Sequence, residues 1–133
     1  MEWKYVKPLV SMDSIDKFEE LVNYHFPEEF KKCVMEYNGG RPIKRAFDTD
    51  KTSERELKSF LSFNKSDKET VWKLYECLEK EISDKYVTFA IDNFGNMICF
   101  NKMDNSINFI NHEEMAIEKI AENFHAFMQM LYD

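Results

Sequence analysis

The carboxylates Asp92 and Glu113 are the side chains of this sequence whose type could support catalysis. A carboxylate pair works as general acid and general base when a cleft brings the two groups together and separates their pKa values. Asp92 also precedes a polar segment, residues 93–96, where an aspartate side chain can accept hydrogen bonds from backbone N–H groups and so form a turn. The sequence favours this turn-forming role, and a small carboxylate-dependent hydrolase is the weaker alternative.

The sequence lacks the residue spacing that a metal site or a catalytic nucleophile needs. The histidines are His25, His112 and His125, and no two of them have the spacing of a helical zinc motif. The pair Gly39-Gly40 is not followed by the Lys-Ser/Thr pair of a phosphate-binding loop, and no G-x-S-x-G motif occurs. We therefore expect no metal, no cofactor and no enzymatic activity.

The three cysteines, Cys33, Cys77 and Cys99, are odd in number and lie far apart without C-x-x-C spacing. This pattern is typical of reduced thiols and indicates a cytoplasmic protein. No apolar run approaches the ~20 residues that cross a bilayer, and residues 1–5 lack the apolar core of a signal peptide. We therefore expect a protein that does not contact a membrane.

The net charge is −7, and residues 85–133 carry seven acidic residues against three basic ones. Binding to a phosphate backbone needs lysine and arginine, so this acidic segment argues against nucleic acid as a partner. A basic protein would be attracted instead, because complementary fields accelerate encounter. The same charge balance is also typical of proteins in which it serves solubility alone.

Residues 27–37 predict the best-defined helix of the chain. Pro27 suits the first helical position, where its missing N–H is not needed. The helix is followed by Asn38-Gly39-Gly40, and Gly39 can adopt the left-handed conformation that closes a helix. The chain contains only three glycines, so two of them together indicate a turn of fixed shape.

Three further helices are predicted from capping signals and apolar spacing. The first begins at Ser14 and has Leu21 among its inward-facing residues. A capping box at residues 66–69 opens another helix that extends to about residue 82. The last runs over residues 118–131 with one apolar face.

The strands and turns between these helices predict the fold class. β-Rich segments indicate strands at 43–48, 57–63, 86–92, 97–100 and 107–110. Polar turns follow at 93–96, where Gly95 can take a positive φ, and at 103–106. Because strands joined by short turns are antiparallel, we expect one α+β domain over residues 1–133. In it, N-terminal helices precede a central antiparallel meander, and a C-terminal helix packs on the sheet.

Several pieces of sequence occur in an order and spacing that together indicate a family. They are Ile15 with Glu19, Pro27-x-x-Phe30, Asn38-Gly39-Gly40, Phe89-Ala90-Ile91-Asp92-x-x-Gly95-Asn96, Ile107-x-Phe109-x-x-His112-Glu113 and Ile120-Ala121-x-x-Phe124-x-x-Phe127-x-x-x-Leu131. In this set the chain resembles the SUKH superfamily, the group related to yeast cell-wall regulators of the Smi and Knr type. Residues 44–84 match the pattern poorly, and Phe26 stands where leucine is more usual.

The resemblance implies a binding role without catalysis. Bacterial members of the superfamily are typically immunity proteins that bind and block toxins, often nucleases, whereas eukaryotic relatives act as intracellular regulatory or scaffold domains. We therefore expect an immunity protein of the bacterial cytoplasm, a monomer or a weak dimer, that covers the basic nucleic-acid cleft of a cognate toxin. The regulatory or scaffold domain is the alternative.

Two predicted loops supply the candidate contact residues for such a partner. Phe94 lies inside a polar turn, where it is either exposed as an aromatic anchor or folded back onto the sheet. The loop before the last predicted helix carries adjacent acidic residues that would face a basic partner. The partner-binding residues that we propose from the sequence are Asp92, Asn93, Phe94, Asn96, Glu113 and Glu114.

Overall fold

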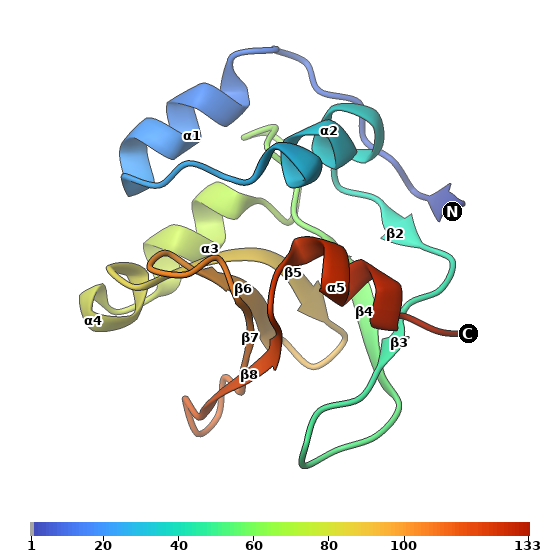
Figure 1. Cartoon of the computed structure of the whole chain (residues 1–133). Helices are drawn as coiled ribbons and strands as arrows, with labels where there is room; N and C mark the ends of the chain where they lie inside the picture. Colours follow the sequence, from blue (N-terminus) through green and yellow to red (C-terminus); the bar gives the residue numbers. More distant parts are fainter. Residues whose placement is uncertain (1) are drawn as a thin grey trace.

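Residues 2–133 are described by the computed structural model, in which helices pack on a curved antiparallel sheet (Figure 1). The five helices in this range are α1 (Ser14–Val22), α2 (Glu28–Tyr37), α3 (Val71–Cys77), α4 (Lys80–Ser83) and α5 (Phe124–Met130). The eight strands are β1 (Trp3–Lys4), β2 (Arg41–Pro42), β3 (Ala46–Phe47), β4 (Arg55–Phe60), β5 (Tyr86–Asp92), β6 (Met97–Asn101), β7 (Ile107–Ile110) and β8 (Ile117–Ala121). This arrangement confirms the predicted α+β class.

The strands β3 to β8 form one sheet in which each strand pairs antiparallel with the next strand along the chain. This is the predicted meander, and it follows from the short connections, because a parallel return needs a long crossover. The predicted bounds of β5 and β7 agree with the structure, and β6 extends one residue further than predicted. The predictions for 43–48 and 57–63 were less accurate, since β3 is only two residues long and β4 begins two residues earlier.

Strand β6 is buried on both faces, which puts it at the centre of the packing. Ile98 and Phe100 contact the main core, whereas Met97 and Cys99 contact a second, smaller cluster. These four side chains are at most 4% exposed. The main core includes side chains of α1, α2 and α5, and the smaller cluster is covered by side chains of α3 and α4. A strand covered on both sides is expected to be apolar, and residues 97–100 of β6 are, whereas Asn101 at its end is partly exposed.

Aromatic rings join the helices to the sheet in the main core. The ring of Phe89 on β5 lies 5.4 Å from that of Phe30 on α2 and 5.9 Å from that of Phe127 on α5, both edge to face. It also lies 4.7 Å from the ring of Phe100 on β6. Edge-to-face pairs of this kind add to the burial energy of each ring. These contacts confirm that the C-terminal helix packs on the sheet.

The turn after α2 has the fixed shape that its residues predict. Gly39 has a φ of +68°, in the left-handed region. A Cβ on Gly40 would lie 2.9 Å from the carbonyl oxygen of Tyr37, so a side chain there would displace the backbone. Asn38 is 2% exposed, and its side chain donates to the Lys7 carbonyl and accepts from the Phe63 N–H, at 2.7 and 2.9 Å. The turn therefore fastens the N-terminal segment to the end of β4. Before the helix, Pro27 is the N-cap and not the first helical residue.

Helix α1 buries a glutamate where an apolar residue was expected. Leu21, predicted to face the core, is 51% exposed, whereas Glu19 is 5% exposed. The carboxylate of Glu19 accepts from the Phe26 N–H at 2.6 Å and lies 3.2 Å from Lys31 Nζ. It thus links the end of α1 to the start of α2. Apolar spacing could not reveal this, because one partner of Glu19 lies in the connection before the next helix and the other lies on that helix.

The start and the length of the third helix were predicted wrongly. Its N-cap is Thr70, whose hydroxyl oxygen accepts from the Lys73 N–H at 3.1 Å, and not Ser66. The segment before it is held away from helical geometry because the Ser62 N–H donates to the Glu69 carbonyl. The helix ends at Cys77, and a separate short helix, α4, follows.

Residues 117–121 form strand β8 and not the first part of the last helix, as the sequence had predicted. The spacing of Ile120, Ala121 and Phe124 suits a helix, but pairing with β7 satisfies backbone groups that would otherwise lie unpaired at a sheet edge. The helix α5 begins only after Asn123, whose side chain accepts from the Ala126 N–H at 2.8 Å. The N-cap residue Asn123 is a local signal for the start of α5, but the apolar spacing of residues 118–131 led to a predicted start that was too early.

Replacing the buried carboxylate of α1 tests this account of the N-terminal half. We expect Glu19→Ala to lower the free energy of unfolding by about 2–3 kcal/mol, because it leaves a buried N–H and a partly buried ammonium without their partner. Urea unfolding followed by circular dichroism measures the change. Glu20→Ala, at an exposed position on the same helix, is the matched control and should change stability little. Equal losses in the two variants would contradict the role of Glu19.

Candidate functional site

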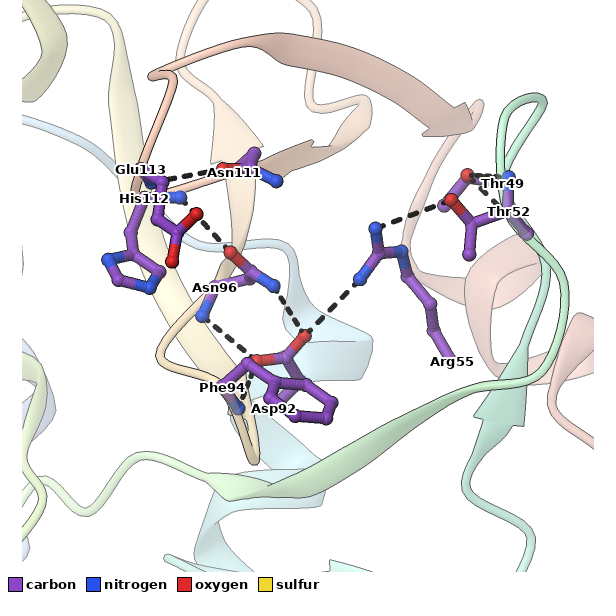
Figure 2. Close-up of polar contacts among 9 residues, drawn as sticks. All are labelled: Thr49, Thr52, Arg55, Asp92, Phe94, Asn96, Asn111, His112 and Glu113. Carbon is purple, nitrogen blue, oxygen red and sulfur yellow. Dashed lines mark hydrogen bonds and ion pairs between the residues drawn. The ribbon is translucent and has the colours of Figure 1, made fainter.

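The carboxylate of Asp92, at the end of β5, shapes the turn that leads into β6 (Figure 2). Its Oδ1 accepts from the backbone N–H groups of Phe94 and Asn96, each at 2.9 Å. Its Oδ2 accepts from Asn96 Nδ2 at 2.9 Å. This confirms the turn-forming role predicted for Asp92. Gly95, between these donors, has a φ of +83°, which few other residues adopt.

Arg55 on β4 balances the charge of this buried carboxylate, and it is not among the site residues predicted from the sequence. Its Nη1 lies 3.8 Å from Asp92 Oδ2, and Nη2 donates to Thr52 Oγ1 at 3.3 Å (Figure 2). The guanidinium carbon also lies 4.3 Å from the centre of the Phe109 ring, a cation–π geometry. No local pattern identifies Arg55, because only the pairing of β4 with β5 brings it to Asp92.

Asn96 connects the β5–β6 turn to the loop between β7 and β8. Its Oδ1 accepts from the His112 N–H at 3.1 Å. In that loop, Asn111 Oδ1 accepts from the N–H group of Glu113 at 3.0 Å (Figure 2) and from that of Glu114 at 3.2 Å, which closes a second side-chain turn. The hydrogen bond from the His112 amide to Asn96 therefore joins the two loops, and Asn111 orders the second loop locally. We call residues 93–95 and 112–115 together the turn surface.

The predicted contact residues separate into an exposed group and a buried group. Phe94 is 76% exposed, which decides between the two positions that the sequence left open for its ring. Asn93, Glu113 and Glu114 are also exposed. Asp92 and Asn96, in contrast, are 2% and 5% exposed, so they hold the turn surface from beneath and present no side chain on it.

The contacts of the Asp92 carboxylate stabilise the β5–β6 turn and do not favour proton transfer to or from a substrate. Its two oxygens together accept three hydrogen bonds and face a guanidinium group. Glu113, in contrast, is exposed, and its amide donates to Asn111 Oδ1. A general base needs an accessible oxygen within reach of the proton that it removes, and Asp92 is 2% exposed.

The histidines and cysteines are distributed over separate parts of the fold. His125 on α5 lies 2.9 Å from Glu29 on α2, whereas His112 belongs to the turn surface. Among residues 2–133, no group of three or more His, Cys, Asp or Glu side chains lies close enough to hold a metal ion. Burial raises the pKa of both the Cys33 and the Cys99 thiol to about 12, whereas Cys77 is exposed. In the same range, no helix has the length and apolar character needed to span a bilayer.

Comparison with known proteins gives one family match. The model of the family SUKH_6, described as SMI1-KNR4 cell-wall, matches residues 12–128. This range includes both segments of the turn surface, together with Arg55, Asp92 and Asn96. No curated protein matches the sequence.

Removing the Asn96 side chain tests whether one network orders both loops. We expect Asn96→Ala to accelerate hydrogen exchange at the His112 amide, which loses its acceptor, and to lower stability by about 1–2 kcal/mol. Exchange measured by NMR or mass spectrometry reports both loops. Asn93→Ala, in the same turn but exposed, is the control and should leave the His112 amide unchanged. An Asn96→Ala variant with normal exchange at His112 would show that the loops are ordered independently.

Proposed function

Because the chain belongs to the SUKH_6 family, described as SMI1-KNR4 cell-wall, we propose that it is a non-enzymatic module that binds another protein. More specifically, we propose an immunity protein of the bacterial cytoplasm, acting as a single domain. Its partner is a cognate toxin with a basic substrate cleft, such as a nuclease. The turn surface lies over that cleft and excludes the substrate. The single observation that carries this proposal is the ordered, exposed and acidic turn surface.

The charge of the turn surface supports a basic partner. Glu113 and Glu114 are exposed and adjacent. The whole chain has a net charge of −7, so its field has the same sign as this surface. Complementary charge accelerates encounter and disfavours partners of the wrong sign. A toxin that binds nucleic acid must carry lysine and arginine in its cleft, which is the complement that such a surface attracts.

The rigidity of the turn surface supports tight binding. A flexible loop loses conformational entropy when a partner orders it, and this loss subtracts from affinity. Here the amide of Phe94 and the amides of His112, Glu113 and Glu114 already have side-chain acceptors. Phe94 therefore extends from a backbone that is already in place, and exposed aromatic side chains of this kind often dominate interfaces.

The regulatory or scaffold domain of the Smi and Knr type remains the second candidate, because the matched family is described by that name. Both candidates bind a protein at an exposed surface, and they differ in what binding achieves. Co-expression with the product of the neighbouring gene separates them. Rescue of growth together with a stable complex on a sizing column supports the immunity protein, whereas a complex without rescue supports the regulatory domain.

Charge reversal tests the turn surface as the interface. We expect Glu113→Lys combined with Glu114→Lys to weaken binding to the neighbouring gene product by about tenfold or more, because attraction becomes repulsion. The dependence of the dissociation constant on salt should also become flatter, since fewer charge pairs form. Titration calorimetry at several salt concentrations measures both effects.

The matched control reverses two exposed acidic residues elsewhere while keeping the same change in net charge. Asp16→Lys with Glu20→Lys serves this purpose, because Figure 1 shows α1 at the end of the molecule opposite the β7–β8 loop. The control should bind nearly as well as the unchanged protein. Equal weakening in both variants would indicate that net charge matters and that the turn surface is not the interface.

A further inference from the structure

A groove of about 330 Å³ lies directly beside the turn surface, and the proposed function assigns no role to it. One wall comes from α3 and the segment after it, and the other comes from the turn surface, including Gly95. Met97, at the start of β6, connects the two. The side chains that matter most here are Leu74, Cys77, Leu78, Met97, His112 and Met115.

The lining of this groove is mainly apolar. Leu74 and Leu78 are partly buried and pack against the smaller cluster under the sheet, to which Met97 belongs. Met115 completes the opposite wall and is 38% exposed. Its φ of +54° fixes the backbone in an uncommon conformation, whereas its thioether side chain can adapt to different shapes. The groove therefore offers apolar contact with one adjustable side.

Acidic residues lie in and beside this apolar lining. Glu79 lines the groove itself, and the described residues that line it include no lysine or arginine. The exposed residues Glu113 and Glu114 follow His112 directly in the same loop. An apolar hollow with a negative rim is complementary to an apolar side chain that has positive charge on either side.

We propose that this groove receives a large apolar side chain of the partner protein, leucine-like or phenylalanine-like, whose neighbours in the partner are lysine or arginine. The inference rests on the proposed function, because it names the feature by which the partner of the turn surface is recognised. The groove accepts the apolar side chain, Phe94 contacts the partner beside it, and the acidic rim pairs with the flanking basic residues. An apolar anchor in a water-excluding pocket is the usual centre of a strong interface.

The exposed thiol of Cys77 reports directly on the occupancy of this groove. Cys77 lines the groove and is exposed, whereas Cys99 is buried and Cys33 is partly buried, and burial raises the pKa of both of these thiols to about 12, which disfavours the reactive thiolate. N-ethylmaleimide near neutral pH should therefore label Cys77 alone, and Cys77→Ser should remove the labelling. In a complex with the neighbouring gene product, we expect labelling of Cys77 to slow by about tenfold or more. Unchanged labelling in a stable complex would overturn the groove proposal while leaving the proposed function intact.

A peptide probe decides the same question without the toxin. A short peptide that alternates lysine with phenylalanine should protect Cys77 from alkylation, and a peptide with glutamate in place of lysine should not. If no complex forms with the gene product, the proposed function fails, and the peptide result still decides whether the groove accepts a basic apolar segment. Equal protection by the two peptides, or none by either, would contradict the proposed specificity.

A substitution in the wall of the groove completes the test. Met115→Lys places a positive charge where the basic partner must approach, so it should weaken the complex, or the protection by the lysine peptide, about tenfold or more. Met103→Lys is the matched control, because Met103 is 90% exposed in the turn at the opposite end of β6. The control should leave binding unchanged. Equal effects of the two substitutions would overturn the groove as the docking site.

Discussion

The buried carboxylate of Asp92 is the interaction on which the ordered surface of this protein depends. A charged group that is 2% exposed is tolerated in a protein interior only when its hydrogen-bonding capacity is used and its charge is balanced. Asn96 and two backbone amides meet the first requirement, and Arg55 meets the second. Because these partners come from different strands, the carboxylate couples the register of the sheet to the shape of a loop. The ring of Phe109 beneath the guanidinium extends this coupling to β7.

This arrangement separates the residues that create order from those that are free to bind. Asp92 and Asn96 use their polar atoms inside the protein, and their neighbours Asn93 and Phe94 are left exposed. Asn111 does the same for Glu113 and Glu114, because it holds their amides and leaves their carboxylates exposed. A surface built in this way loses little entropy on binding, which would favour the proposed binding of a partner protein. The apolar groove beside it adds to the apolar area that Phe94 already exposes on this surface.

The parts of the fold that could be predicted from sequence are those whose signals are local. Strands β5 and β7 are apolar runs bounded by turn residues, and both of their ends agree with the prediction. The turn at Asp92 was correctly anticipated, since an aspartate followed by Asn93 and Gly95 carries its own turn chemistry. The predictions failed where a neighbour in space decided the outcome. Residues 117–121 have helical spacing, but β7 offered them a strand partner. Leu21 was predicted to face the core and is exposed, whereas contacts at the start of α2 give Glu19 a buried role.

The sequence by itself therefore determined the fold class, the order of the central strands, the turns between them and the acidic character of the surface, because each depends on residues adjacent in the chain. Only the tertiary structure decided which of the candidate residues are exposed. Arg55 and Asp92 meet because β4 pairs with β5, and the groove exists because α3 packs beside the turn surface. Such contacts join segments far apart in the chain, and their free energy depends on strand register and on burial. No local pattern of residues contains that information.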